Sequence, residues 1–295
     1  MHKHLIGIAA LVGLAGSAMA QNVAIVAAAS TSSTSLSFTE VERLLNESAL
    51  FDSVTVINTV TTTPTLDELL AFDSVIVWTN NTPGDPATLG DNLADYVDMG
   101  GGVVVATFAN SSTTTDRDIA GRWRGNPDYE VIVPRSGNQS GGASLGTILE
   151  PGHPIMAGVT TFFGGTSSFR PRVTDLNPGA RSIAEWDDGR VLVAIGANEK
   201  RVDLGFYPPP STSSSGFWDI STDGNLLLAQ SLLFAAGGDE CRADLDGDGS
   251  LTLFDFLAFQ NLFDSGDLLA DFDGDGSLTL FDFLAFQNEF DAGCE

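Results

Sequence analysis

Regularly spaced aspartates near the C-terminus are the residues of this sequence best suited to chemistry. Residues 243–266 and 270–293 are two copies of one segment, offset by 27 residues and different at only three positions. Each copy has aspartates at alternate positions, then a glycine, and a further aspartate seven residues after the last of these. A hard cation needs six to eight oxygen ligands, and alternate residues of a tight loop direct their oxygens inward. The spacing therefore predicts two EF-hand-type loops that bind two Ca²⁺ ions.

The predicted ligands occupy loop positions 1, 3, 5, 7, 9 and 12, and position 7 contributes its backbone carbonyl. They are Asp244, Asp246, Asp248, Ser250, Thr252 and Asp255 in the first copy, and Asp271, Asp273, Asp275, Ser277, Thr279 and Asp282 in the second. Gly249 and Gly276 stand at position 6, where the loop turns sharply. Solvated acidic turns without a metal are the alternative. Because position 12 is Asp rather than the longer Glu, we expect moderate affinity.

The acidic residues are unevenly distributed along the chain. The formal net charge is −26, from 13 Lys+Arg and 39 Asp+Glu, and residues 239–295 hold 15 of the acidic residues and one basic residue. Such a charge argues against a nucleic-acid or anionic-membrane partner and favours cations. The apolar fraction of 43% is enough for a sizeable core. The composition thus separates a body, residues 21–238, from a tail, residues 239–295.

The first twenty residues have the pattern of a secretory signal peptide. A short basic start with Lys3 precedes an apolar run over residues 5–16, and Ala20 ends a small-x-small cleavage motif. We expect cleavage after Ala20, export to the extracellular space or cell surface, and no direct membrane insertion; a short membrane anchor is the alternative. Cys241 and Cys294 flank the tail and predict one disulfide in an exported protein, with two free thiols as the alternative.

The segment after each loop is apolar on nearly every side. On residues 253–263 a helix would carry one stripe of Phe256, Phe259 and Phe263, with Leu253, Phe254, Leu257 and Leu262 spread over the other faces. A module this small cannot bury so wide an apolar surface, and exposed apolar area usually marks an interface. We therefore expect a docking surface; packing of the two helices against each other and the body is the alternative.

The tail resembles a dockerin, a module of two calcium loops, each followed by one helix. This resemblance implies docking to a cohesin-like or other surface protein, in a polysaccharide-degrading or surface-assembly context. Many dockerins have small hydroxylated residues at loop positions 10 and 11. This sequence instead has Leu253-Phe254 and Leu280-Phe281, which favours a more apolar partner surface.

In the body, short apolar runs alternate with amphipathic stretches. The expected strands are residues 22–29, 53–58, 74–79, 102–108, 191–195 and 201–207, and the expected helices are 38–50, 65–71, 87–99 and 226–236. Thr65 and Glu68 have the spacing of a capping box. Continuous apolar strands that alternate with helices are typical of a parallel sheet covered on both faces. The sequence predicts a flavodoxin-like α/β domain, followed by a small all-α calcium-binding module.

This organisation resembles the class I glutamine amidotransferase-like fold, in particular its ThuA-like branch. The resemblance is carried by residues 93–105 (LADYVDMGGGVVV), residues 150–159 (EPGHPIMAGV) and the closing helix at 226–237. It implies a cysteine after the strand at 102–108, but Ala109-Asn110-Ser111-Ser112 follows, and the body contains no cysteine. Glutaminase chemistry needs an activated thiolate, so that activity is excluded.

Other catalytic arrangements fit the body less well. Ser144 lies in a G-x-S-x-G motif with His153 nearby, but an elbow serine needs a strand before it and a helix after it, and the flanking residues favour loops. Paired acids could hydrolyse glycosides, although adjacent surface acids are usually solvated. These pairs are Asp116 with Asp118 and Asp187 with Asp188.

A recognition function agrees better with the arginines and tryptophans of the body. The group consists of Arg117, Arg122, Trp123 and Arg124 after the fourth strand, with Trp78 and Trp218 near strand ends. Such residues suit a sugar or an anionic ligand, and internal salt bridges are the alternative. We expect a non-catalytic ligand-binding body, with carbohydrate as one open ligand. The alternative function is a secreted carbohydrate-active hydrolase, of glycosidase or esterase type, with unidentified catalytic acids.

Overall fold

A computed structural model of the chain divides into two compact units. The residues that the structure describes are 21–112, 117–133, 137–237, 243–245, 251–272 and 277–292. The predicted signal peptide, both cysteines and five predicted calcium ligands (Asp246, Asp248, Ser250, Asp273 and Asp275) lie outside them. Within these residues, no helix is long and apolar enough to cross a membrane.

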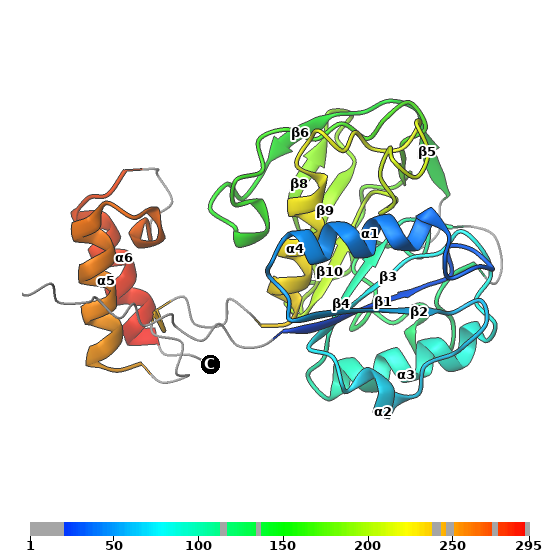
Figure 1. Cartoon of the computed structure of the whole chain (residues 1–295), viewed down its shortest axis with the longest axis horizontal. Helices are drawn as coiled ribbons and strands as arrows, with labels where there is room; N and C mark the ends of the chain where they lie inside the picture. Colours follow the sequence, from blue (N-terminus) through cyan, green and yellow to red (C-terminus); the bar gives the residue numbers. More distant parts are fainter. Residues whose placement is uncertain are drawn as a thin grey trace, which may run out of the picture. The chain divides into compact units, whose positions relative to one another are not determined.

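The larger unit begins with parallel strands joined by helices, as the sequence predicts (Figure 1). Its first elements are β1 (Asn22–Ala27), α1 (Leu36–Glu47), β2 (Ser53–Asn58), α2 (Leu66–Leu69), β3 (Ser74–Val77), α3 (Pro86–Asp98) and β4 (Gly102–Ala106). Each helix begins at a residue that can cap it: Ser35 for α1, Thr65 for α2 and Asp85 for α3. The capping box of Thr65 and Glu68 is present.

The second half of the sheet is antiparallel, which corrects the prediction of an all-parallel sheet. The further strands are β5 (Asn138–Ser140), β6 (Leu145–Ile148), β7 (Phe169–Pro171), β8 (Arg181–Trp186), β9 (Val191–Ile195) and β10 (Arg201–Leu204). The eight-stranded order is β2-β1-β3-β4-β10-β9-β8-β6, and pairing is parallel up to β10 and antiparallel beyond it. The reason is connection length: only a few residues join β8 to β9 and β9 to β10, and such short loops can join only antiparallel strands.

Helices cover both faces of this sheet, so alternate residues of one strand enter two different cores. Val23 and Ile25 of β1 pack in the core beneath α1 and α4 (Gly224–Ala235), whereas Ala24 and Val26 pack in the core beneath α2 and α3. Figure 1 shows the two helix pairs on opposite sides of the sheet. At Gly102 the backbone of α4 comes so close that a β-carbon would lie 2.1 Å from the carbonyl oxygen of Ala235.

Short elements complete the larger unit. β5 pairs with β7 in a separate two-stranded sheet, and two 3-10 turns, η1 (Gly121–Trp123) and η2 (Pro154–Met156), lie in the connections. The sequence did not indicate β5, β6, β7 or β8. β6 includes Thr147 and Ile148, which were expected to lie in a loop.

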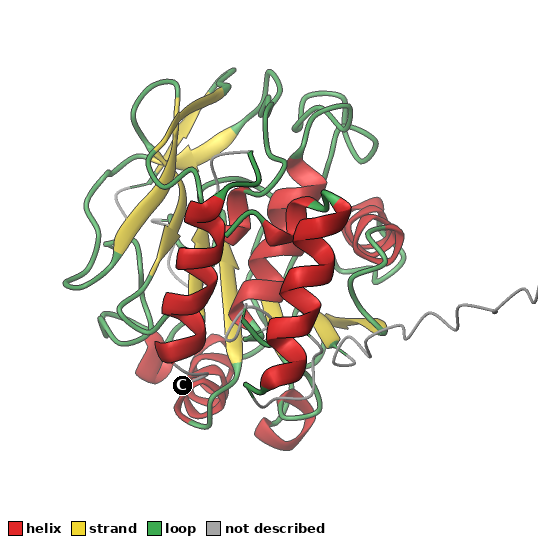
Figure 2. Cartoon of the chain, turned by 90° about the vertical axis from the view of Figure 1, so that its left-hand side faces the viewer, coloured by secondary structure: helices red, strands yellow, loops and turns green. Residues whose placement is uncertain are grey.

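The described residues of the smaller unit form two helices and a connecting turn: α5 (Leu253–Ser265), η3 (Leu268–Ala270) and α6 (Leu280–Ala292). Gly266 ends α5 in the left-handed conformation (φ 76°), which favours glycine. The helices lie side by side, visible in Figure 2, and the rings of Phe259 and Phe286 stack between them with centroids 4.5 Å apart. The core also contains Ala243, Ala270 and Phe272.

Candidate calcium loops and docking face

The position-12 aspartates lie at the beginnings of the two tail helices and are fully buried. Asp255 accepts a hydrogen bond at 2.7 Å from the backbone N–H of Thr252, and Asp282 accepts one at 2.6 Å from that of Thr279. A carboxylate is favourable at a helix N-terminus, where backbone N–H groups lack partners within the helix. In both copies, the start of the helix that follows the loop therefore holds the carboxylate of loop position 12 in place.

The other predicted ligands are only partly placed. Asp244, Asp271, Thr252, Thr279 and Ser277 are described, but the central loop aspartates are not. Among the described residues no group of three or more His, Cys, Asp and Glu could hold a metal ion. The donors predicted at both loops are carboxylate, hydroxyl and carbonyl oxygens, and this set fits the preference of Ca²⁺.

The two tail helices present the same apolar residues outward. We call these six residues, Leu253, Phe254 and Leu257 with Leu280, Phe281 and Leu284, the outward apolar face. The first two residues of each helix are 66–69% exposed. In the predicted stripe, Phe259 is buried in the core with α6, and Phe256 and Phe263 are partly buried and pack against that core. Leu262, which the sequence placed outside that stripe, is partly buried and packs against this core.

At the carboxyl end of β4 the chain has no catalytic cysteine or histidine. Asn110 is buried, and its amide donates to the backbone oxygens of Val105 and Leu204 at 3.2 and 3.1 Å. Ser111 is also buried and lies 2.5 Å from the side-chain oxygen of Asn138. These polar groups hold the loop after β4 together.

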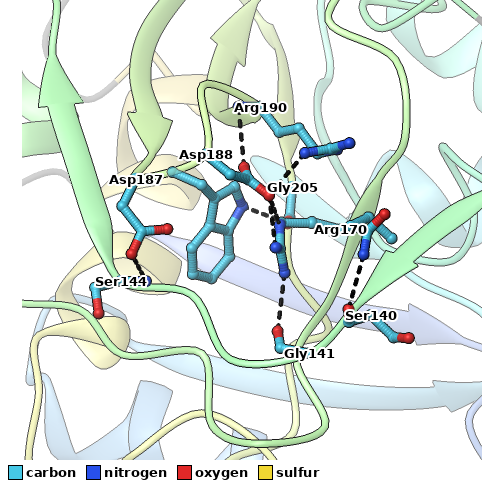
Figure 3. Close-up of polar contacts among 10 residues, drawn as sticks. Ser140, Gly141, Ser144, Arg170, Asp187, Asp188, Arg190 and Gly205 are labelled. Carbon is cyan, nitrogen blue, oxygen red and sulfur yellow. Dashed lines mark hydrogen bonds and ion pairs between the residues drawn. The ribbon is translucent and has the colours of Figure 1, made fainter.

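The G-x-S-x-G segment does not form a nucleophile elbow. The backbone N–H of Ser144 donates to Asp187 at 3.2 Å, and the short strand β6, not a helix, follows (Figure 3). Beside it, Arg170 donates to Asp188 and to the carbonyl oxygen of Gly141, and Arg190 donates to the same carboxylate of Asp188. Asp187 and Asp188 therefore stabilise loops and are not a free pair of acids.

The side chain of His153 makes structural contacts within its own turn and with α4. Its Nδ1 accepts a hydrogen bond from the backbone N–H of Ile155 at 3.2 Å, and its ring lies 4.8 Å from that of Phe234. Burial lowers the pKa of this imidazole. The residue begins the turn η2.

Most of the arginines and tryptophans singled out from the sequence serve internal packing. Arg122 pairs with Asp95 and Asp98, and Arg124 pairs with Asp118 at 2.6 Å. The four tryptophans (Trp78, Trp123, Trp186 and Trp218) are all buried, so none presents a ring face to solvent for a sugar. Asp116 lies outside the described residues.

A buried ion pair that the sequence analysis did not identify lies on β10, one of the central strands of the sheet. Arg201 and Asp203 of β10 are almost completely buried and lie 3.3 Å apart, and Arg201 also donates to the backbone oxygens of Tyr129 and Val103. Its guanidinium is 4.5 Å from the ring centre of Trp123. Burial raises the pKa of Asp203 to about 6 and lowers that of Arg201 to about 10. The signal was available: two opposite charges at alternate positions of one apolar strand.

Two small cavities lie in the larger unit, and each is too small for a substrate. One is lined by Asn110, Trp123, Arg201 and Asp203, and the other by Ser168, Tyr207, Phe217 and Trp218. Each has a volume of about 10 Å³, which is close to the minimum for one water molecule.

Comparisons with known proteins find similarity at the level of fold. No protein-family profile matches the sequence, and no curated protein matches it significantly. A ThuA-like protein from Bacteroides uniformis is 15% identical, with a TM-score of 0.51 over 73% of this chain and 91% of that chain. A ThuA-like protein from Parabacteroides merdae is 15% identical, with a TM-score of 0.49 over 74% and 91%. A GMP synthase protein from Thermoplasma acidophilum is 12% identical, with a TM-score of 0.46 over 75% and 96%.

These identities are too low to transfer an activity or a substrate. The likeness to the Bacteroides uniformis structure nevertheless extends over most of both chains. The chain therefore has the α/β fold seen in ThuA-like proteins, followed by two C-terminal helices.

Proposed function

We propose that this chain is an exported, calcium-binding modular protein whose tail docks to a cohesin-like or other surface partner. The larger unit would be a ligand-binding domain that carries out no glutaminase chemistry, in a polysaccharide-degrading or surface-assembly context. The observation that carries this proposal is the outward apolar face, which repeats the same three residues at the start of α5 and of α6.

The position of this face links docking to calcium. Leu253 and Phe254 follow the predicted ligand Thr252 directly and precede Asp255, so the loop that binds the ion also orients the residues that would meet the partner. Large apolar side chains at the centre of an interface contribute most of the binding energy. Calcium would then control docking because it orders the loops on which this face begins.

A pull-down from the native exported fraction, with the full chain as bait, tests the proposal. We expect a surface protein with a cohesin-like module to be captured in calcium and lost in chelator. The variant with Leu253, Phe254, Leu280 and Phe281 all changed to Ser should lose this capture, whereas Leu269→Ser, which alters a 67%-exposed leucine of the same unit, should keep it. Because the two copies are nearly identical, a variant altered in only one copy should still bind.

Two results would reject docking by this face. One is that no such partner is captured in calcium, which would leave metal binding alone. The other is capture that the fourfold variant and the Leu269→Ser control retain equally.

A further inference from the structure

One edge of the eight-stranded sheet has unused hydrogen-bonding groups. The strand order places β2 at the end of the sheet, where it pairs only with β1 (Figure 1). The backbone groups of residues 53–57 make no hydrogen bond to any described residue outside β1. The N–H and C=O groups on the other side of β2 can therefore pair with a further strand.

The two edges of this sheet differ in how they are protected. The opposite edge strand, β6, has only four residues and an irregular register against β8. Short length and irregular pairing are features that keep a sheet edge from pairing with another chain. β2 has six residues in an unbroken register with β1, and it contains no proline and no charged residue. Of the two edges, β2 is thus the one suited to accept a strand.

The apolar side chains of β2 are incompletely covered on both faces of the sheet. Val54 and Val56 pack against the core beneath α1 and α4, and Ile57 packs against the opposite core, but all three are only partly buried. The residues of β1 that pair with them are completely buried. A strand beside β2 would shield these side chains on both faces, which is favourable for apolar surface.

The charge of the chain restricts what can lie at this edge. With a net charge of −26, two copies repel each other wherever acidic surfaces meet. Residues 53–66 carry no charge, and four of the six residues of β2 are β-branched, the type that suits a strand. We propose that β2 pairs in the antiparallel direction with β2 of a second copy, so that the two sheets join across a two-fold axis.

The symmetry fixes which side chains meet. A two-fold axis perpendicular to the sheet keeps each face on its own side, so residues directly opposite each other belong to the same face. With Thr55 on the axis, Val54 of each copy lies opposite Val56 of the other, on the face that α1 covers. Asp52 of each copy then lies opposite Asn58, so the acidic residues of this segment do not face each other.

This pairing goes beyond the proposed function and is independent of it, because it uses only the larger unit. A failed pull-down would reject docking by the tail and leave the pairing of β2 standing. A chain that stays monomeric would do the reverse.

The first test is the mass of the full chain in calcium buffer, measured by light scattering over a series of concentrations. We expect the mass of two chains. Thr55→Lys should give the mass of one chain at the same concentrations, because it sets two like charges directly opposite each other at the axis. Thr55 is exposed, so this substitution should change the stability of the fold little.

Two matched variants should remain dimeric. Thr174→Lys adds the same charge at an exposed position between β7 and β8. The variant with four serines in the outward apolar face separates pairing by β2 from association through the tail.

The second test is a cross-link by Thr55→Cys. Residues directly opposite each other in an antiparallel pair have Cα atoms about 4.5–5.5 Å apart, which is within the range that a disulfide spans. Mild oxidation should therefore give a covalent dimer that a reductant separates. Thr174→Cys, which keeps the same native cysteines, should give none.

Three results would overturn the proposal. One is the mass of a single chain at every concentration measured. Another is a dimer that Thr55→Lys leaves intact, because such a dimer forms through a different surface. The third is a dimeric chain in which Thr55→Cys cross-links no better than Thr174→Cys, and this result counts even where the lysine variant disturbs the fold.

Discussion

At the scale of single residues, His153 has a structural role in the turn that it begins. Its Nδ1 accepts the backbone N–H of Ile155, so the neutral ring carries its proton on Nε2. Protonation of Nδ1 would end this hydrogen bond and would place a charge against Phe234. Burial lowers the pKa of the ring. The nearby carboxylates of Glu150 and Glu199 raise this pKa, whereas the charge of Arg181 lowers it further.

The stability of the larger unit should therefore depend on pH through His153. In the unfolded chain the ring gains a proton as the pH falls below about 6.5, whereas in the folded chain it stays neutral to a lower pH. The unfolded state then binds more protons, so the free energy of unfolding should decrease as the pH is lowered from 7.5 towards 5. Urea unfolding, followed by tryptophan fluorescence, measures the decrease.

His153→Asn is the matched variant, since Asn accepts a hydrogen bond at the start of a helical turn and does not titrate. It should show a smaller loss of stability over the same pH range. Parallel pH profiles for the two proteins would contradict the assignment.

At the scale of elements, α5 and α6 divide their apolar residues between two tasks. Phe259 and Phe286 are buried and stack on each other, whereas Phe254 and Phe281 are 66% and 67% exposed. In each helix, therefore, one phenylalanine packs in the core and another is exposed to solvent. Periodicity indicates that a helix has faces, and only the packed pair shows which face is inward.

Alanine substitutions should separate these tasks. Phe259→Ala or Phe286→Ala should lower the free energy of unfolding of the smaller unit by about 3–5 kcal/mol, because each leaves a cavity. Phe254→Ala and Phe281→Ala should change it by only about 0.5 kcal/mol. Thermal unfolding followed by circular dichroism in calcium gives the comparison, and equal losses at core and surface positions would contradict the placement of the two faces.

The mixed sheet also shows where prediction from local patterns ends. β1, β2, β3 and β4 were recognised because they are largely apolar runs that alternate with the helices α1, α2 and α3. The parallel direction predicted for β9 was wrong, because an apolar run has the same pattern in a parallel and an antiparallel strand. β6 and β8 escaped notice because they lie at the sheet edge or include polar residues, so their apolar signal is weak.

At the scale of the whole molecule, the charge is concentrated where cations are predicted. Residues 239–295 carry 15 acidic residues and one basic residue, and the aspartates of the two loops are crowded into short segments. Without a cation these carboxylates repel one another, so metal binding and folding of the smaller unit should be linked.

Calcium removal should unfold the smaller unit and leave the larger one intact. α5 and α6 have 13 residues each, against 12, 4, 13 and 12 in α1 to α4, so more than a third of the described α-helical residues should lose their signal. Circular dichroism with and without a chelator measures this loss, and calorimetry should show one transition disappear while another remains. At calcium concentrations about 100 times Kd, each site should add about 2.7 kcal/mol.

Asp244→Asn with Asp271→Asn, which removes one ligand charge from each loop, should shift the calcium midpoint to higher concentration. A circular dichroism spectrum that does not change on chelation would reject the link between metal and folding.

The sequence by itself determined the features that local order encodes. The spacing of Asp244, Asp255 and their copies predicts two calcium loops, the capping box at Thr65 placed a helix start, and the body contains no cysteine for glutaminase chemistry. Only the tertiary structure decided the rest. It reversed the later strands, buried all four tryptophans and paired Arg201 with Asp203. The reason is physical: capping and loop geometry act over a few residues, whereas burial and pairing depend on segments far apart in the chain.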